Sequence, residues 1–273
     1  MSDFYKNKIA FVTGAGSGIG LALSRELILN GCIVYLADIN SEALKNEVDK
    51  IGINANAIQL DVTNRNAFVM VVEKIIKEHN QIDFLFNNAG IGYAGDTLGY
   101  SFEDWDELID VNLKGVINGT AIIYPLMKKQ GSGHIIFTAS LAGLVPSAML
   151  VPYATSKHAI IGLSRSLRLE AEAYNVNVSA ICPGTIDTPM LDNSKPTSMD
   201  EEFSIDTREY LTLISGKPMS SSKFATEVLK GVEKNQEFIF YPKKAKEIWR
   251  FSRFMPKTLN KLAKKALKKF RTK

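Results

Sequence analysis

A tyrosine and a lysine four residues apart have the chemistry for proton transfer. Tyr153 and Lys157 follow Pro152, a residue type that favours the first turn of a helix, so the two side chains should share one helix face. A tyrosine with an ordinary pKa of about 10 is a poor base, but a neighbouring ammonium and a positively charged ligand favour its phenolate form. Ser140 follows an apolar run and could orient a substrate oxygen. These residue types predict proton transfer at an alcohol or carbonyl.

A glycine-rich turn near the N-terminus could bind a phosphate group. Residues 13–20 read TGAGSGIG and stand between an apolar run and a helical pattern. Glycine allows close approach of the backbone to an anion, and a helix N-terminus attracts negative charge. The strict pattern G-x-G-x-x-G is not met, because Ile19 stands where the third glycine should be. Packing is the alternative role, but we predict that a dinucleotide pyrophosphate is bound by Gly14, Ser17, Gly18, Ile19 and Gly20.

An acidic residue at the end of the second apolar run predicts which dinucleotide is used. Asp38 lies eighteen residues after Gly20. A carboxylate there accepts hydrogen bonds from a ribose 2′-hydroxyl and repels a 2′-phosphate, so NAD is expected rather than NADP. The alternative is that Asp38 only caps a helix beginning near Ser41.

Short apolar runs alternate with helical patterns along most of the chain. Strands are expected at 8–12, 33–37, 55–60, 82–86, 134–139, 176–181 and 238–240, and helices at 19–29, 41–50, 64–78, 111–128, 152–173 and 222–234. This alternation predicts an α/β fold, a Rossmann-type doubly wound parallel sheet of about seven strands with helices on both faces. The expected catalytic domain is 1–242, with 185–218 as a substrate-binding lid, followed by a basic extension, 243–273.

The order of these motifs resembles the short-chain dehydrogenase/reductase family. The resemblance covers 8–188 and rests on the glycine-rich turn, Asn87-Asn88-Ala89-Gly90, Asn112, Ser140, Tyr153-x-x-x-Lys157 and Pro183-Gly184. It implies hydride transfer between a nicotinamide C4 and a carbinol or carbonyl carbon.

The resemblance also implies roles for single residues. Tyr153 would be the general acid/base, Lys157 would hold the nicotinamide ribose, Ser140 would orient the substrate and Asn112 would support a water-linked proton relay. A homodimer or homotetramer is implied as well, and Asp38 fits the family's NAD-preferring branch. The remaining cofactor contacts that it implies are Asp61 and Val62 at the adenine, Asn88, Ala89 and Gly90 beneath the cofactor, and Pro183, Gly184, Ile186 and Thr188 at the nicotinamide.

Composition limits the class of protein. The 273 residues, 45% of them hydrophobic, can form a sizeable core, which excludes a disordered chain. No apolar run is long enough to span a membrane and no signal peptide is evident, so a cytoplasmic protein is expected. Neither a metal site nor a disulfide is expected, because the two cysteines and three histidines are scattered: Cys32, Cys182, His79, His134 and His158.

The substrate pocket should be largely apolar. Met149, Met190 and Leu191 are expected to contact substrate together with Ser140 and Tyr153. Further candidate lining residues are Ile91, Tyr93, Leu141, Val145, Leu150, Phe203, Tyr210 and Leu213. A lipophilic secondary alcohol or ketone of the sterol, retinoid or long-chain type is therefore expected. The same enzyme acting as a carbonyl reductase is one alternative, and an NAD-sensing or scaffold module without catalysis is another.

The basic extension has a separate character. Residues 243–273 carry a net charge of +12, so the rest of the chain sums to −8. After Pro256, apolar residues recur at helical spacing with basic residues between them, which predicts a cationic amphipathic helix. Such a helix could lie on an anionic membrane surface, making the protein peripheral, or dock on the body or a second subunit. Nucleic acid is not the expected partner.

Overall fold

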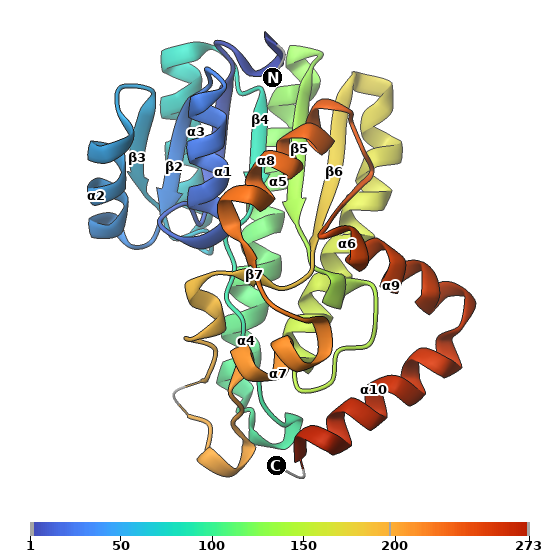
Figure 1. The fold of residues 1–273 in the computed structure, drawn as a ribbon. Coiled ribbons are helices and arrows are strands. Elements are labelled where there is room, and N and C mark those ends of the chain that lie inside the picture. Colours follow the sequence, from blue (N-terminus) through green and yellow to red (C-terminus); the bar gives the residue numbers. More distant parts are fainter. Residues whose placement is uncertain (1–2, 197, 272–273) are drawn as a thin grey trace.

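Seven parallel strands form the central sheet of the computed structural model, which describes residues 3–196 and 198–271 (Figure 1). Their order is β3-β2-β1-β4-β5-β6-β9, so the chain reverses direction across the sheet between β1 and β4. Ligands bind at such a switch point, beyond the carboxyl ends of the strands. The predicted doubly wound sheet is confirmed. The strands are β1 (Ile9–Thr13), β2 (Ile33–Asp38), β3 (Ala55–Gln59), β4 (Phe84–Asn87), β5 (Gly133–Thr138), β6 (Val176–Pro183) and β9 (Phe238–Tyr241).

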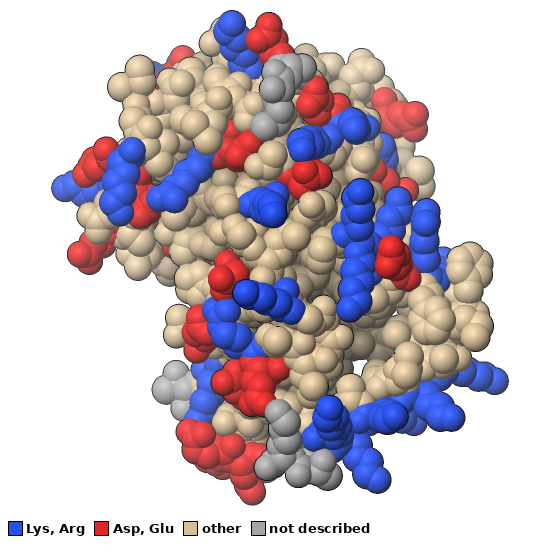
Figure 2. Space-filling model, viewed as in Figure 1, with Lys and Arg blue, Asp and Glu red and all other residues tan. Residues whose placement is uncertain are grey.

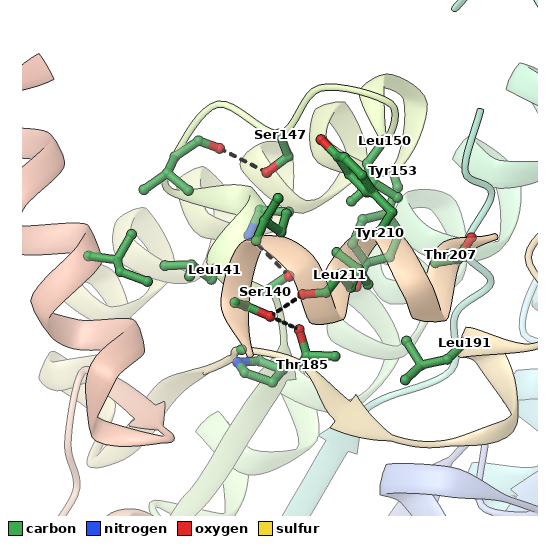
Figure 3. A pocket seen from close by; sticks show the side chains of 18 of the residues that line it. Ser140, Leu141, Ser147, Leu150, Tyr153, Thr185, Leu191, Thr207, Tyr210 and Leu211 are labelled. Atoms are coloured by element: carbon green, nitrogen blue, oxygen red, sulfur yellow. Dashed lines mark hydrogen bonds between the residues drawn. The ribbon is translucent and has the colours of Figure 1, made fainter. Parts of the chain in front are cut away.

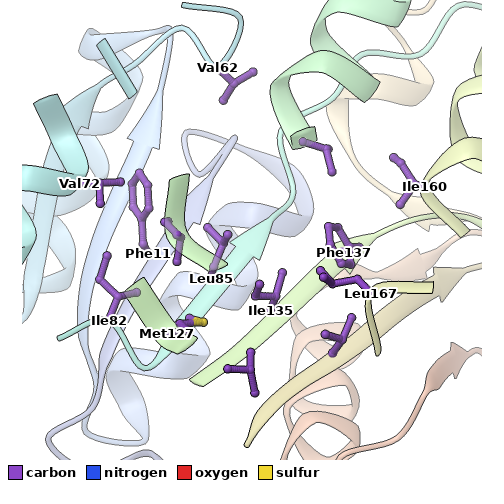
Figure 4. Packing of buried hydrophobic residues seen from close by; sticks show 14 of the residues in the cluster. Phe11, Val62, Val72, Ile82, Leu85, Met127, Ile135, Phe137, Ile160 and Leu167 are labelled. Carbon is purple, nitrogen blue, oxygen red and sulfur yellow. The ribbon is translucent and has the colours of Figure 1, made fainter. Parts of the chain in front are cut away.

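Helices cover both faces of the sheet because the strands are apolar on both sides. One apolar cluster joins the sheet to α1 (Gly18–Leu29), α2 (Ser41–Ile51) and α8 (Ser221–Glu233). The other, in which Phe11, Leu85 and Ile135 project from the sheet, packs against α3, α5 and α6 (Figure 4). These helices are α3 (Arg65–His79), α5 (Gly115–Gln130) and α6 (Val151–Ala171). The two layers make the sheet a rigid support for its carboxyl edge.

A helix that the sequence analysis did not predict precedes α5. It is α4 (Phe102–Ile109), and Ser101 is its N-cap residue. The Ser101 hydroxyl accepts from the Asp104 amide while the Asp104 carboxylate accepts from the Ser101 amide, which is a capping box. A π-helical turn, η3 (Asp110–Lys114), joins α4 to α5. The expected helix 111–128 therefore begins inside a longer helical segment.

The segment between β6 and α8 and the C-terminal extension lie beyond the carboxyl edge of the sheet (Figure 1). The former contains a short parallel pair, β7 (Ile186–Asp187) and β8 (Met219–Ser220), and a helix, α7 (Thr207–Ser215). The extension forms α9 (Lys243–Phe254) and α10 (Pro256–Arg271). The expected boundaries 1–242, 185–218 and 243–273 stay predictions, and residues 1–2, 197 and 272–273 within them lie outside the described residues. Shorter helical turns are η1 (Asp3–Tyr5), η2 (Thr97–Gly99), η4 (Leu141–Gly143), η5 (Glu172–Tyr174), η6 (Pro189–Leu191) and η7 (Glu201–Phe203).

Two searches of the described residues bear on membranes and metals. None of the helices described is long and apolar enough to cross a membrane. The same residues contain no group of three His, Cys, Asp or Glu side chains placed to hold a metal ion. Cys32 and Cys182 are both buried free thiols. The cytoplasmic location stays a prediction.

Candidate active site

The glycine-rich turn joins β1 to α1 and packs closely against the end of β4. Gly14 has φ +64° and Gly18 has φ +54°, a region that favours glycine. A Cβ on Gly14 would lie 2.7 Å from the Ala89 Cα, and one on Gly20 would lie 2.1 Å from the Gly14 carbonyl oxygen. Close packing therefore explains part of the glycine pattern, which is the alternative role named in the sequence analysis.

The same turn leaves the start of α1 suited to an anion. Ser17 is the N-cap residue, but its side chain makes no capping hydrogen bond to the first turn. The first amides of a helix have no partner within the helix, so they can donate to a phosphate together with the positive end of the helix dipole. The turn therefore fits the pyrophosphate of a nicotinamide dinucleotide. When bound, such a dinucleotide would supply its nicotinamide C4 as the hydride donor or acceptor.

Asp38 ends β2 beside this turn. Its Oδ2 accepts from the Gly16 amide at 2.9 Å, and its Oδ1 accepts from the Asn40 amide at 3.0 Å. The N-cap of α2 is Asn40, whose side chain accepts from the Ala43 amide, so capping that helix is not the role of Asp38. The sequence analysis did not predict that Gly16 contacts Asp38. The contact is close, since a Cβ on Gly16 would lie 3.0 Å from the Asp38 carboxyl carbon.

Asn88 ties three strands together beneath the turn. Its Nδ2 donates to the carbonyl oxygens of Thr13 at 3.0 Å and Gly14 at 3.2 Å, and its Oδ1 accepts from the Thr138 hydroxyl at 3.0 Å. The Thr13 hydroxyl oxygen in turn accepts from the Asn88 and Ala89 amides. Because every bond crosses between strand ends, this network fixes the floor on which a cofactor would lie.

Asn112 is fully buried in the π-helical turn. Its Oδ1 accepts from the Ile91 amide at 2.8 Å, while its Nδ2 donates to the Ile91 carbonyl at 2.9 Å and to the Ser156 hydroxyl at 3.2 Å. The side chain thus connects the loop after β4 to α6. A Cβ on Gly90 would lie 3.0 Å from the Asn112 Oδ1 and 3.6 Å from the Lys157 Nζ, so Asn112 borders the lysine.

The structure brings Ser140, Tyr153 and Lys157 to one place at the carboxyl edge of β5. Tyr153 and Lys157 lie on the first turns of α6, with the ammonium 5.5 Å from the phenol ring centroid. The Lys157 Nζ donates to the Thr138 carbonyl at 2.8 Å, which anchors it to β5. Ser140 follows that strand, and its hydroxyl oxygen accepts from the Ala142 amide at 3.1 Å.

Burial sets the proton affinities of this cluster. It raises the pKa of Tyr153, and the hydrogen bond with Ser140 lowers that pKa only in part. The sequence analysis expected Lys157 and a positively charged ligand together to favour the phenolate; in the chain by itself, burial outweighs the Ser140 hydrogen bond. Burial also lowers the pKa of Lys157 to about 8.

Replacing the buried ammonium should make the protein more stable. Lys157 has a folded pKa of about 8 against 10.5 for an exposed lysine, so the folded state carries an ionisation cost below pH 8 that fades as the pH rises to 10.5. We expect Lys157→Met to raise the free energy of unfolding by roughly 1 to 3 kcal/mol at pH 7, with the gain shrinking toward pH 10.5. Denaturant titrations over this pH range measure it. The exposed Lys223→Met is the control, and a Lys157→Met protein less stable at every pH contradicts the prediction.

The other predicted cofactor residues lie along the same edge. The Asp61 Oδ1 accepts from the amide and the hydroxyl of Thr63, so this carboxylate also orders the turn before α3. Val62 is buried against Gly115. Across the edge, the Thr188 side chain lies against Gly18, where a Cβ would be 3.3 Å away. The predicted residues that line the adjoining cavity are Ile19, Pro183, Gly184, Ile186 and Thr188.

A cavity of about 510 Å³ opens beside Ser140 and Tyr153. Figure 3 shows that Ser140, Tyr153 and Tyr210 enter it from different elements: the loop after β5, α6 and α7. Most of the described side chains that line it are apolar, and none of these is an arginine. The predicted apolar residues that line it are Leu141, Val145, Leu150, Met190, Leu191, Tyr210 and Leu213.

Four predicted pocket residues are not among those lining the cavity: Met149, Ile91, Tyr93 and Phe203. Met149 is buried with φ +63°, and its carbonyl accepts from the Gly95 amide. In contrast, the C-terminal extension supplies lining residues that the sequence analysis did not assign to the pocket: Lys244, Ile248, Leu259, Leu262, Ala263 and Ala266. The apolar stripe of α10 indicated an amphipathic helix, but not that its apolar side lines the pocket.

Comparisons with known proteins agree with this geometry. A family model described as short chain dehydrogenase matches residues 8–198. The chain is 37% identical over 188 residues to the 3-oxoacyl-acyl-carrier-protein reductase FabG of Thermotoga maritima, covering 68% of this chain and 76% of that one. It is 31% identical over 253 residues to the C alpha-dehydrogenase of a Sphingobium species, covering 89% and 83%.

A solved structure shares nearly the whole fold. The short-chain dehydrogenase/reductase of Burkholderia phymatum in complex with NAD matches with a TM-score of 0.83 at 26% identity, covering 93% of this chain and 95% of that one. The family match takes in the glycine-rich turn, Asn112, Ser140, Tyr153 and Lys157. The protein therefore belongs to the short-chain dehydrogenase/reductase family and is an oxidoreductase.

Proposed function

We propose that this protein transfers a hydride between NAD and a lipophilic secondary alcohol or ketone of the sterol, retinoid or long-chain type. The observation that carries the proposal is the apolar cavity of about 510 Å³ that opens directly beside Ser140 and Tyr153. An apolar cavity with a few polar groups at one end orients a lipophilic molecule by its single oxygen.

The contacts within the cluster support a role for each of its residues. Tyr153 exchanges a proton with the substrate oxygen, and Ser140 holds that oxygen by hydrogen bonding. Lys157, fixed by the Thr138 carbonyl, supplies a positive charge next to Tyr153 and binds the nicotinamide ribose. Asn112 holds the loop after β4 against α6 and borders Lys157, which supports a place for it in the proton relay.

NAD is the proposed cofactor. Asp38 presents a carboxylate at the end of β2, held by the Gly16 and Asn40 amides. Such a carboxylate accepts from a ribose 2′-hydroxyl and repels a 2′-phosphate. The solved Burkholderia phymatum short-chain dehydrogenase/reductase is in complex with NAD, which supports this choice.

Two further parts of the proposal concern the oligomeric state and a membrane contact. We propose a homodimer or homotetramer formed through the helices that carry the site, a view supported by the large exposed apolar side chains of Phe102, Ile117 and Leu169 on α4, α5 and α6. We also propose a peripheral contact of the C-terminal extension with an anionic membrane.

An absorbance assay for NADH tests the proposed reaction. The purified protein is given NAD or NADP with secondary alcohols that range from short polyols to long-chain alcohols and sterols. We expect turnover with NAD and the lipophilic alcohols. Reduction of the matching ketones by NADH would establish the carbonyl reductase direction. Cofactor binding without turnover of any compound would instead favour the NAD-sensing module, and turnover of polyols alone would contradict the lipophilic substrate.

The wall formed by α10 should set the size of the substrate. Ala266 lines the cavity from α10, so Ala266→Phe places a ring where the far end of a long substrate would lie. We expect kcat/KM for a sterol or long-chain alcohol to fall about tenfold or more, and that for a short secondary alcohol to change little. Steady-state kinetics with both substrates measure this. Lys265→Ala, next to it on the exposed face, is the matched control; equal losses for both substrates contradict the prediction.

A further inference from the structure

The helices α9 and α10 form an arm that leaves the body and returns to it across the pocket (Figure 1). At its base, Trp249 stacks on Phe240 of β9 with ring centroids 5.1 Å apart. At its far end, Phe270 packs edge-to-face on Tyr210 at 5.0 Å, and Arg271 pairs with Asp96. Between these attachments none of the described residues of α10 is buried. The arm is thus held at its two ends and spans the cavity in between.

The corner between α9 and α10 exposes large apolar side chains. Phe254 is 83% exposed and Met255 is 49% exposed, and Phe251 precedes them one turn earlier on α9. Three such side chains at one corner form an apolar patch, which is uncommon on a surface that meets only water. The described part of the body does not cover this corner, so an external apolar surface would be needed to bury these side chains.

Basic side chains surround this apolar corner. Residues 243–273 carry a net charge of +12 and contain a single acidic residue, Glu247, whereas the rest of the chain carries a net charge of −8. In Figure 2, blue side chains follow the outer edge of the arm on both sides of an uncharged corner, and a hollow separates the arm from the body. An anionic surface would attract the arm and repel the body, which fixes the orientation of the molecule on it.

The inner side of the arm is part of the substrate pocket. Ile248 on α9 and Leu259 and Leu262 on α10 line the cavity. Leu262 is still 54% exposed, so the cavity is open to solvent at this side chain of the arm. The arm therefore presents apolar side chains to the cavity on one side and at its outer corner.

We propose that the arm rests on an anionic lipid surface, with Phe251, Phe254 and Met255 inserted among the lipids, and that the lipophilic substrate enters the pocket from the lipid between α9 and α10. This inference rests on the proposed function for its substrate class. The basic rows bind the lipid headgroups, and the apolar corner explains why the partner is a lipid surface rather than a nucleic acid, whose phosphates offer nothing to three large apolar side chains.

Vesicle flotation of the full chain tests the lipid contact without any assay of activity. We expect the protein to float with vesicles of phosphatidylcholine and phosphatidylglycerol, not with phosphatidylcholine alone, and less at high salt. The double variant Phe254→Ser with Met255→Ser should weaken the association about tenfold or more, because it removes the inserted side chains and no charge. The control is Ile53→Ser, at a side chain that is 99% exposed elsewhere. Equal flotation with neutral vesicles, an unaffected double variant, or displacement of the vesicles by duplex DNA overturns the proposal.

Activity in the same vesicles tests the entry route. The double variant should lower kcat/KM about tenfold for a long-chain secondary alcohol dissolved in the anionic vesicles, and leave that for a short water-soluble secondary alcohol unchanged. Normal turnover of the vesicle-dissolved alcohol by a variant that no longer floats overturns the entry route. Flotation as expected with no turnover of either alcohol by the unaltered protein means that the proposed reaction fails while the lipid contact stands.

Discussion

Tyr153→Phe is expected to lower kcat for alcohol oxidation by about 1,000-fold, while the protein stays folded and keeps its affinity for NAD. The aromatic ring remains in place on α6, so packing is preserved, and only the hydroxyl that exchanges the proton is lost. Steady-state kinetics and cofactor titration measure the two quantities separately. A variant with unchanged activity on every substrate would show that Tyr153 is not the acid/base.

The dependence on pH provides a second readout of the same variant. Because burial raises the pKa of Tyr153, the phenolate of the free protein forms only at alkaline pH, and kcat/KM for oxidation should rise with pH until this group has ionised. The rise should be absent from the residual activity of Tyr153→Phe. Tyr210→Phe is the matched control, since Tyr210 lines the same cavity but donates to the Ala148 carbonyl. Loss of activity in both variants would point to a disturbed pocket instead.

Asp38→Ser is expected to change the preference between NAD and NADP by roughly 100- to 1,000-fold in kcat/KM. Two charges about 4 Å apart repel with on the order of 4 kcal/mol near a protein surface, and each 1.4 kcal/mol is a factor of ten. The carboxylate also accepts from the Gly16 and Asn40 amides, so some activity with NAD should be lost as the turn loosens. Kinetics with both cofactors measure the ratio.

Asp38→Asn separates the charge from these hydrogen bonds. The amide oxygen can still accept from one backbone amide, but the repulsion of a 2′-phosphate is gone. We expect kcat/KM with NADP to rise in both variants. We expect kcat/KM with NAD to fall less in Asp38→Asn than in Asp38→Ser. Glu42→Gln, which removes an exposed acid from α2, is the control for net charge. An unchanged cofactor preference in both Asp38 variants would remove the argument for NAD.

The sequence by itself determined the fold and the members of the polar cluster. Parallel strands end at one edge of the sheet, so the residues after β1, β2, β4 and β5 had to meet there once the alternation of strands and helices was recognised. The spacing of Tyr153 and Lys157 fixed their common helix face in the same way. Local periodicity and short motifs suffice for such inferences because each depends on neighbours in the sequence.

Tertiary structure decided the proton affinities, the cap of α2 and the walls of the pocket. The direction of the Tyr153 pKa depends on burial by distant segments, which outweighs the neighbouring serine. Asn40 rather than Asp38 caps α2, because Asn40 directly precedes the first residue of the helix, while Asp38 accepts from the Gly16 and Asn40 amides. The apolar stripe of α10 predicted an amphipathic helix, but a stripe does not specify what its apolar side faces. Only the path of α9 and α10 across the carboxyl edge makes that stripe a wall of the substrate pocket.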